Sequence, residues 1–304
     1  MFHHLNITRS GNNGVYIFFV ISGFVIYLKL FSRDRPTPFQ FFRNRITKIF
    51  FLYWVALFIL SLLLPFPLDS SAIQTILLFP GHISRIKVSW SLSYELYFYF
   101  LTAAIVYLLP HKYAKTVLFL LLISATMVSI LYTGGWIQIK SSVLNFFLGK
   151  NTWHFFLGLL SGYLSTISFK SARVPLILPA FILGTILLSA AFIYPSDDLF
   201  TVLVTGALST GLVCLSTVYE RRNPLPAKQA RVFGILGDAS YAIYLFAPIV
   251  GIMIPGRNPQ EKIIIVLLTI SISVLVNRFI EGPGLVFCRK MLSVFKPVHI
   301  ISEC

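Results

Sequence analysis

The sequence predicts an all-α fold, a polytopic bundle of transmembrane helices that forms a single domain over residues 1–304. Three observations predict it. Hydrophobic residues fill 57% of the positions, only 12% are charged, and the mean hydropathy is +0.82, unlike a soluble globular domain. Apolar stretches of about 18 residues, enough to cross a hydrocarbon core of roughly 30 Å as helix, recur along the chain. Lys and Arg gather in alternate loops, as the positive-inside rule requires.

The apolar stretches predict about nine spans. In chain order they are 14–31, 49–65, 89–109, 116–133, 153–169, 174–195, 199–219, 232–255 and 263–281. The first is the apolar run behind the polar N-terminal segment, and the second follows a basic loop that ends at Lys48. The third carries Glu95 near its start. The later spans are separated by short charged loops, and the last is expected to stop at Gly282 and Pro283.

Strict alternation of these spans predicts the orientation of the chain. If the loop before Lys48 is cytoplasmic, most of the 25 basic residues fall inside, and so does the C-terminus. We therefore expect a multi-pass protein of the plasma membrane, which is the inner membrane in bacteria. Met1 then lies outside, so we also expect that a first transmembrane helix, ending in the letters MFHHLN, has been lost from the N-terminus.

The same distribution bears on partners and ligands. The net charge of +15 has its origin in cytoplasmic loops, so we expect membrane lipid and no nucleic acid as partners. Cys214, Cys288 and Cys304 are scattered without metal-ligand spacing, so neither a disulfide framework nor a metal site is expected.

Three acidic residues lie in or at the ends of apolar spans. Glu95, Asp238 and Glu281 are candidates for function, because an ionisable group in a membrane usually faces a cavity or a partner. Asp238 can cap or pair locally, and Glu281 can pair with Arg278 three residues earlier. Glu95 is expected to lie one to two turns below the outer surface, where burial suits its carboxyl to proton transfer. The alternative is an interhelical ion pair or hydrogen bond that only fixes the packing.

Two clusters of other residues complete the candidate chemistry. His3 and His4 fall on the outer side, and imidazole is the usual general base for activating a hydroxyl near neutral pH, although a solvated N-terminal end is the simpler reading. Arg43, Arg45 and Lys48 fall on the cytoplasmic side. The positive-inside rule accounts for them, but Arg also binds phosphate, so an anionic nucleotide-like cofactor could dock there.

Five blocks in order resemble the signature of the membrane-bound acyltransferase 3 family, in its exopolysaccharide-acylating branch. The blocks are GVYIFFVISGFVIY (14–27), RNRITKIFFLYW (43–54), WSLSYELYFYF (90–100), GDASYAIYLF (237–246) and FIEGP (279–283). Together with the His pair they cover nearly the whole chain. Tyr16, Phe51 and Ala247 depart from the family pattern, where an acidic residue, a Pro and a His are frequent.

The resemblance implies an O-acyltransferase with ten transmembrane helices. Such an enzyme takes an acyl group, usually acetyl from acetyl-CoA, and transfers it to a hydroxyl of a cell-surface or exported polysaccharide or a lipid-linked sugar. His3, or alternatively His4, matches the family His, and Glu95 matches its buried Glu. Arg43, Arg45 and Lys48 match the basic block near the cofactor site. Within the blocks, substrate contacts are expected from Ser22, Trp90, Ser91, Tyr94 and Tyr241.

The resemblance and the charge pattern together place the base and the carboxylate on the outer face and the phosphate-binding residues on the cytoplasmic face. Two alternatives remain open at this point. Glu95 would also suit a proton-coupled transporter or flippase, although the chain shows no internal repeat of the kind that transporters use. An inactive acyltransferase fragment would also explain the absent first helix.

Overall fold

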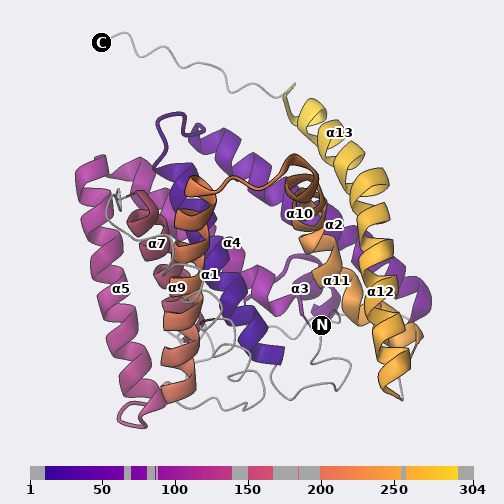
Figure 1. Ribbon diagram of the computed structural model, residues 1–304, viewed down its shortest axis with the longest axis horizontal. Coiled ribbons are helices and arrows are strands. Elements are labelled where there is room, and N and C mark those ends of the chain that lie inside the picture. Colours follow the sequence, from indigo (N-terminus) through magenta and orange to yellow (C-terminus); the bar gives the residue numbers. More distant parts are fainter. Residues whose placement is uncertain are drawn as a thin grey trace.

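The computed structural model describes residues 11–64, 70–80, 86, 88–138, 150–166, 184, 199–254 and 258–293. Within these ranges every regular element is a helix, so the predicted all-α class is confirmed (Figure 1). The elements are α1 (Gly11–Leu30), α2 (Pro38–Leu63), α3 (Ser70–Ile76), α4 (Trp90–Leu108), α5 (His111–Thr133), α7 (Lys150–Thr166), α9 (Leu199–Arg222), α10 (Ala227–Asp238), α11 (Ser240–Met253), α12 (Pro259–Val276), the π-helix η1 (Asn277–Glu281) and α13 (Gly282–Ser293).

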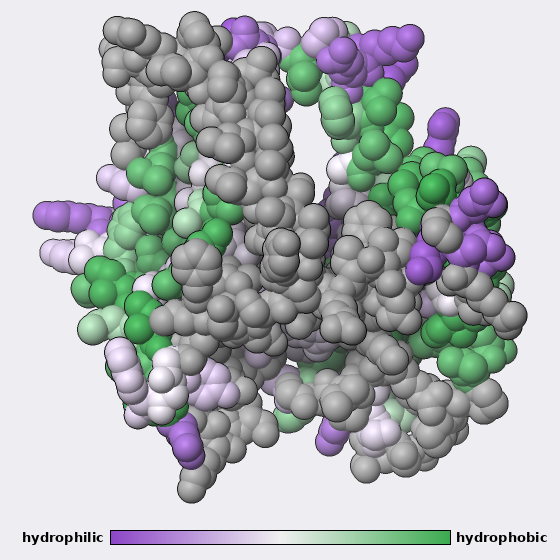
Figure 2. Space-filling view, turned by 60° about the horizontal axis from the view of Figure 1, so that its bottom comes forward, coloured by the Kyte–Doolittle hydropathy of each residue, from purple (hydrophilic) through white to green (hydrophobic). Residues whose placement is uncertain are grey.

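Eight of the nine predicted spans coincide with helices. Within the described ranges, five helices are long and apolar enough to cross a membrane, and six if the bent pair of α10 and α11 counts as one span. The predicted span 174–195 lies outside the described residues except at Gly184, so the total of nine stays a prediction. Apolar side chains cover much of the described surface in Figure 2, as a lipid-facing exterior requires.

The second span begins earlier than the sequence predicted. Helix α2 starts at Pro38, because Thr37 and Gln40 form a capping box in which each side chain accepts a hydrogen bond from the other's backbone N–H. Proline at the first helical position favours the same start. The basic residues Arg43, Arg45 and Lys48 therefore lie on the first three turns of a membrane helix and not in a loop before it.

Two further boundaries differ from the prediction. The last helical stretch does not end at Gly282 and Pro283 but continues as α13 to Ser293. The π-helix η1 accommodates one extra residue before this point, and the Gly282 N–H donates to the Asn277 carbonyl. The span predicted as 232–255 is two helices that meet at Ala239 with a bend of 54°. At this bend the Ser240 hydroxyl donates to the Gly237 carbonyl.

Helices α1 and α7 pack against each other at very short range where they cross. A Cβ added to Gly23 would lie 2.1 Å from the carbonyl oxygen of Phe155, and one added to Gly158 would lie 2.1 Å from that of Val20. The two backbones therefore touch, as in membrane helix pairs that use small residues to approach. This crossing holds α1 against the centre of the bundle, where the Phe98 ring of α4 stacks on Phe155 with centroids 4.3 Å apart.

The segment of the short helix α3 is held against α2 and α4 by side chains that donate hydrogen bonds to its backbone carbonyls. The Tyr53 hydroxyl bonds to the Thr75 carbonyl at 2.6 Å, and the Ser93 hydroxyl bonds to that of Leu78 at 2.8 Å. Leu78 has a φ of 53°, the left-handed value of a residue that ends a helix. These bonds help to fix the first turns of α4, which carry Glu95.

Candidate functional site

Glu95 lies on the second turn of α4 and is buried, with 7% of its surface exposed. It borders a cavity of about 290 Å³ between four helices. The lining residues are Phe18, Ile21, Ser22 and Val25 of α1, Arg45, Lys48 and Ile49 of α2, Glu95 and Tyr99 of α4, and Ser240, Tyr241 and Tyr244 of α11. The carboxylate thus faces a hollow with mixed polar and apolar walls and not the lipid.

Tyr99 is the partner of Glu95. One turn further along α4, it donates its phenolic hydrogen bond to a Glu95 carboxyl oxygen. The Ser22 hydroxyl of α1 faces the same pair. The guanidinium of Arg45 lies over the Tyr99 ring, 5.1 Å from its centroid, in a cation–π contact. One tyrosine therefore joins the buried carboxylate to a cation.

Arg45 and Lys48 line the same cavity as Glu95. The sequence predicted the basic cluster and Glu95 on opposite faces of the membrane, but the structure does not separate Arg45 and Lys48 from Glu95 in this way. Because α2 starts at Pro38, Arg45 lies seven residues into the helix, or about 10 Å from its start. Within the described part of the chain, neither cation forms a salt bridge. Both charges act on Glu95 across the cavity.

Arg43 does not line the cavity. Two residues before Arg45 on the helix, it is turned by about 200° and points to another side. Its guanidinium lies over the Phe39 ring, 5.7 Å from the centroid. Of the three predicted basic residues, the structure therefore brings two into the cavity.

The predicted substrate residues divide in the same way. Ser22 and Tyr241 line the cavity, and the Tyr241 hydroxyl also donates to the Ile49 carbonyl at 2.7 Å. Ser91 lies one step away, because its hydroxyl is 2.6 Å from that of the lining residue Tyr244. Trp90 and Tyr94 pack edge-on against the Phe19 ring and do not line the cavity.

The predicted base lies outside the described residues, since His3 and His4 both precede residue 11. His154, which the sequence gave no reason to select, is fully buried near the start of α7. Its ring stacks on that of Tyr16 with centroids 4.3 Å apart. It does not line the cavity at Glu95. The adjoining run of buried aromatic residues in α7 was the only signal of its burial.

The other two acidic candidates, Asp238 and Glu281, do not line the cavity and are both bonded to Asn277, near the break between α10 and α11. Glu281 is 2% exposed and accepts a hydrogen bond of 2.9 Å from the Asn277 amide, so the predicted pairing with Arg278 is wrong. Arg278 lies over the Phe279 ring instead. The same Asn277 amide donates to the backbone carbonyl of the exposed Asp238 at 3.0 Å.

Lys48 connects these two acidic centres. Lys48 lines the cavity, and its positive charge is close enough to act on Glu281 as well as on Glu95. Sequence spacing gave no signal of this arrangement, since Lys48, Glu95 and Glu281 come from three separate blocks.

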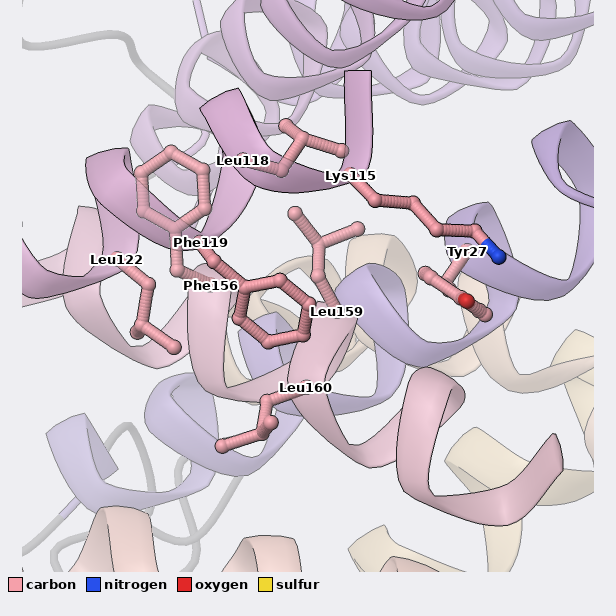
Figure 3. Close-up of a pocket in the computed structure, with 8 residues that line it drawn as sticks. All are labelled: Tyr27, Lys115, Leu118, Phe119, Leu122, Phe156, Leu159 and Leu160. Atoms are coloured by element: carbon pink, nitrogen blue, oxygen red, sulfur yellow. The ribbon is translucent and has the colours of Figure 1, made fainter. Parts of the chain in front are cut away.

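A second hollow lies between α1, α5 and α7 and is of a different kind. It measures about 10 Å³, room for no more than about one water molecule. Figure 3 shows that its walls are mostly leucine and phenylalanine, with the Lys115 side chain extending toward Tyr27. This hollow is a packing gap.

Among the described residues, no three His, Cys, Asp or Glu side chains come together as a metal site would require.

The sequence is similar to known proteins. The family model described as "Acyltransferase domain" matches residues 2–278. The chain is also 28% identical over 263 residues to the exopolysaccharide production protein ExoZ of Rhizobium meliloti (strain 1021), covering 80% of this chain and 77% of that protein. No solved structure matches the chain. The match to the family model covers α1, α2, α4 and α11, the helices that line the cavity. The chain therefore belongs to the acyltransferase 3 family, of membrane-bound acyltransferases.

Proposed function

We propose that this acyltransferase moves an acyl group, usually acetyl, from acyl-CoA to a hydroxyl of an exopolysaccharide or its lipid-linked precursor. The acceptor class is supported by the similarity to ExoZ, a protein of exopolysaccharide production. The observation that carries the proposal is the convergence of Glu95 with Arg45 and Lys48 on one cavity. A transferase needs such a site, where the donor and the acceptor hydroxyl meet.

Arg45 and Lys48 suit the donor. They present two positive charges without salt bridges in the described chain, and Arg binds phosphate oxygens in a planar fork. The cavity volume is near the lower end of the range of about 300–1,000 Å³ for sites that enclose a drug-sized ligand. It therefore suits the acyl thioester end of the donor. The phosphates then lie by the two cations, and the nucleotide remains outside.

Glu95 suits the acceptor step. In the proposed reaction the sugar hydroxyl loses its proton to a base, its oxygen forms the new bond to the acyl carbon, and the C–S bond breaks to release CoA as the thiol. His3 or His4 is the proposed base, with Glu95 orienting it or accepting the proton. Tyr99 holds the Glu95 carboxyl in place for this role.

The proposed orientation puts the C-terminus in the cytoplasm of the cell and the sugar acceptor at the outer side of the inner membrane. Since Arg45 and Glu95 share one cavity, the donor reaches Glu95 from the cytoplasmic side through the bundle.

The test is transfer of radiolabelled acetyl from acetyl-CoA to exopolysaccharide. Membranes that contain the protein are compared with membranes from the same strain without its gene. Label that enters the polysaccharide only with the protein and only from the CoA thioester supports the proposal. Proton-coupled movement of a solute without any CoA requirement contradicts it.

A further inference from the structure

Helix α10 has no protein core to rest on. All twelve of its residues are exposed, and none is buried. A Cβ added to Gly234 or Gly237 would meet nothing within 4 Å. An isolated helix of this length is marginal in water, so its stability must come from something that covers one of its faces.

The side chains of α10 are divided into two faces. Val232, Phe233, Ile235 and Leu236 are between 37% and 61% exposed and fall within an arc of about 160° at 100° per residue. The opposite face holds small residues, namely Ala227, Ala230 and Gly234. The apolar face is therefore continuous and open.

Positive charge lies at the edge and at the N-terminal end of this apolar face. At 100° per residue Arg231 falls just beside the arc, and Lys228 falls within it, one turn before Val232. Lys228 and Arg231 are exposed, and within the described part of the chain neither is paired with a carboxylate. The only acidic residue in the helix is its last, Asp238. A basic amphipathic helix of this pattern suits a leaflet with anionic headgroups, because the long side chains reach the phosphates while the apolar face enters the acyl region.

The length of the bent pair favours lipid over a protein partner. Helix α11 has 14 residues and is about 21 Å long, which is too short for a hydrocarbon core of roughly 30 Å. With the bend of 54°, the 12 residues of α10 add about 11 Å along the α11 direction. The pair crosses the core only if the apolar end of α10 lies within it. The Asn277 amide, bonded to the Asp238 carbonyl, fixes this end of α10.

We propose that α10 enters the membrane obliquely, with Lys228 and Arg231 bound to anionic phospholipid headgroups and its apolar face among the acyl chains. In the orientation given above this is the cytoplasmic leaflet. Figure 1 shows α10 at the same end of the molecule as the end of α13. The proposal concerns a lipid-binding surface and does not depend on the reaction.

Spin labels on single cysteines test the proposal in the full chain, with Cys214, Cys288 and Cys304 replaced by Ser. Val232→Cys and Leu236→Cys place labels on the apolar face, and Ala230→Cys is a control two residues away on the opposite face. In vesicles containing phosphatidylglycerol, labels at 232 and 236 should be more accessible to oxygen than to a water-soluble nickel chelate, with 236 the deeper. The label at 230 should show the reverse.

Three results would overturn the proposal. Equal access of the nickel chelate to all three labels would place α10 in water. Low access to both reagents at 232 and 236 would place the face against protein, and dipolar broadening between labels would identify a second copy. The third result concerns the two basic residues. Lys228→Gln and Arg231→Gln are each expected to lower about fivefold the fraction of protein whose labels at 232 and 236 report insertion into the membrane, and only in vesicles that contain the anionic lipid. An equal loss in phosphatidylcholine alone would contradict the headgroup contact.

Discussion

The hydroxyl of Tyr99 donates a hydrogen bond to the carboxyl of Glu95, one turn away on α4, while the Tyr99 ring lies beneath the guanidinium of Arg45. Through these two contacts, a residue that orients the carboxylate also contacts a cation of the proposed donor site. The roles of the hydroxyl and of the ring can be tested separately, because Tyr99→Phe removes the hydroxyl and keeps the ring.

Tyr99→Phe should lower kcat for acyl transfer about 10- to 100-fold and leave KM for acyl-CoA nearly unchanged. The variant loses a hydrogen bond to a charged group, which is worth about 1.5–3 kcal/mol, but keeps the ring that supports Arg45. Steady-state kinetics with acetyl-CoA as the varied substrate measure both constants. Tyr113→Phe, at an exposed position of α5, is the matched control and should behave as wild type. A rise in KM with unchanged kcat would mean that Tyr99 serves the donor alone.

Lys48→Met should raise KM for acyl-CoA about 10- to 100-fold, because a charge-assisted hydrogen bond to phosphate is lost. Arg45→Lys should raise it less, since the charge remains and only the planar contact with Tyr99 is removed. Lys112→Met, at an exposed position of α5, is the control. If all three variants keep the wild-type KM, the two cavity cations do not bind the donor.

Gly23→Ala and Gly158→Ala should each destabilise the protein strongly, by about 1–3 kcal/mol or more. In both cases the added methyl group meets backbone of the partner helix at 2.1 Å, and backbone cannot rotate away as a side chain can. Thermal unfolding in detergent micelles measures the effect. Gly211→Ala on α9 adds the same methyl group into open space and should keep the wild-type Tm. Equal Tm values for all three variants would contradict the close crossing of α1 and α7.

Gly284→Ala should also lower Tm, but this loss should be recovered by a second change. The added Cβ would lie 2.0 Å from the ring of Phe51. Phe51→Leu removes the ring atoms concerned. The double variant should therefore be more stable than the sum of the two single changes, with a coupling of about 0.5–3 kcal/mol. Simple additivity would show that Phe51 and Gly284 do not pack together.

Much of the site followed from the sequence because a charge inside an apolar run is costly. Glu95 was found in this way, and its burial beside a cavity is confirmed. Ser22 and Tyr241, taken from the family blocks, also line that cavity. These residues belong to long apolar helices, and long apolar helices are the elements that hydropathy predicts best.

The errors came from helix ends, which hydropathy describes poorly. Arg43, Arg45 and Lys48 lower the local hydropathy, so α2 was predicted to start after them, although the capping box of Thr37 and Gln40 starts it at Pro38. Because of that error of eleven residues, Arg45 and Lys48 were expected apart from Glu95, whereas the three residues line one cavity. Likewise, Glu281 was expected to pair with Arg278, three residues earlier, whereas its carboxyl accepts a hydrogen bond from the Asn277 amide, four residues earlier.

The most direct test of the central claim is acetyl transfer by Glu95→Gln, measured together with acetyl-CoA binding on the same purified, reconstituted protein. The amide keeps the size of the side chain but cannot hold a negative charge or accept a proton at the carboxylate. We expect transfer to fall about 100-fold or more, within the range for loss of a general acid or base, while Kd for acetyl-CoA changes less than about twofold. Glu220→Gln, at an exposed site at the end of α9, should leave both quantities unchanged. Wild-type transfer by Glu95→Gln would contradict the account.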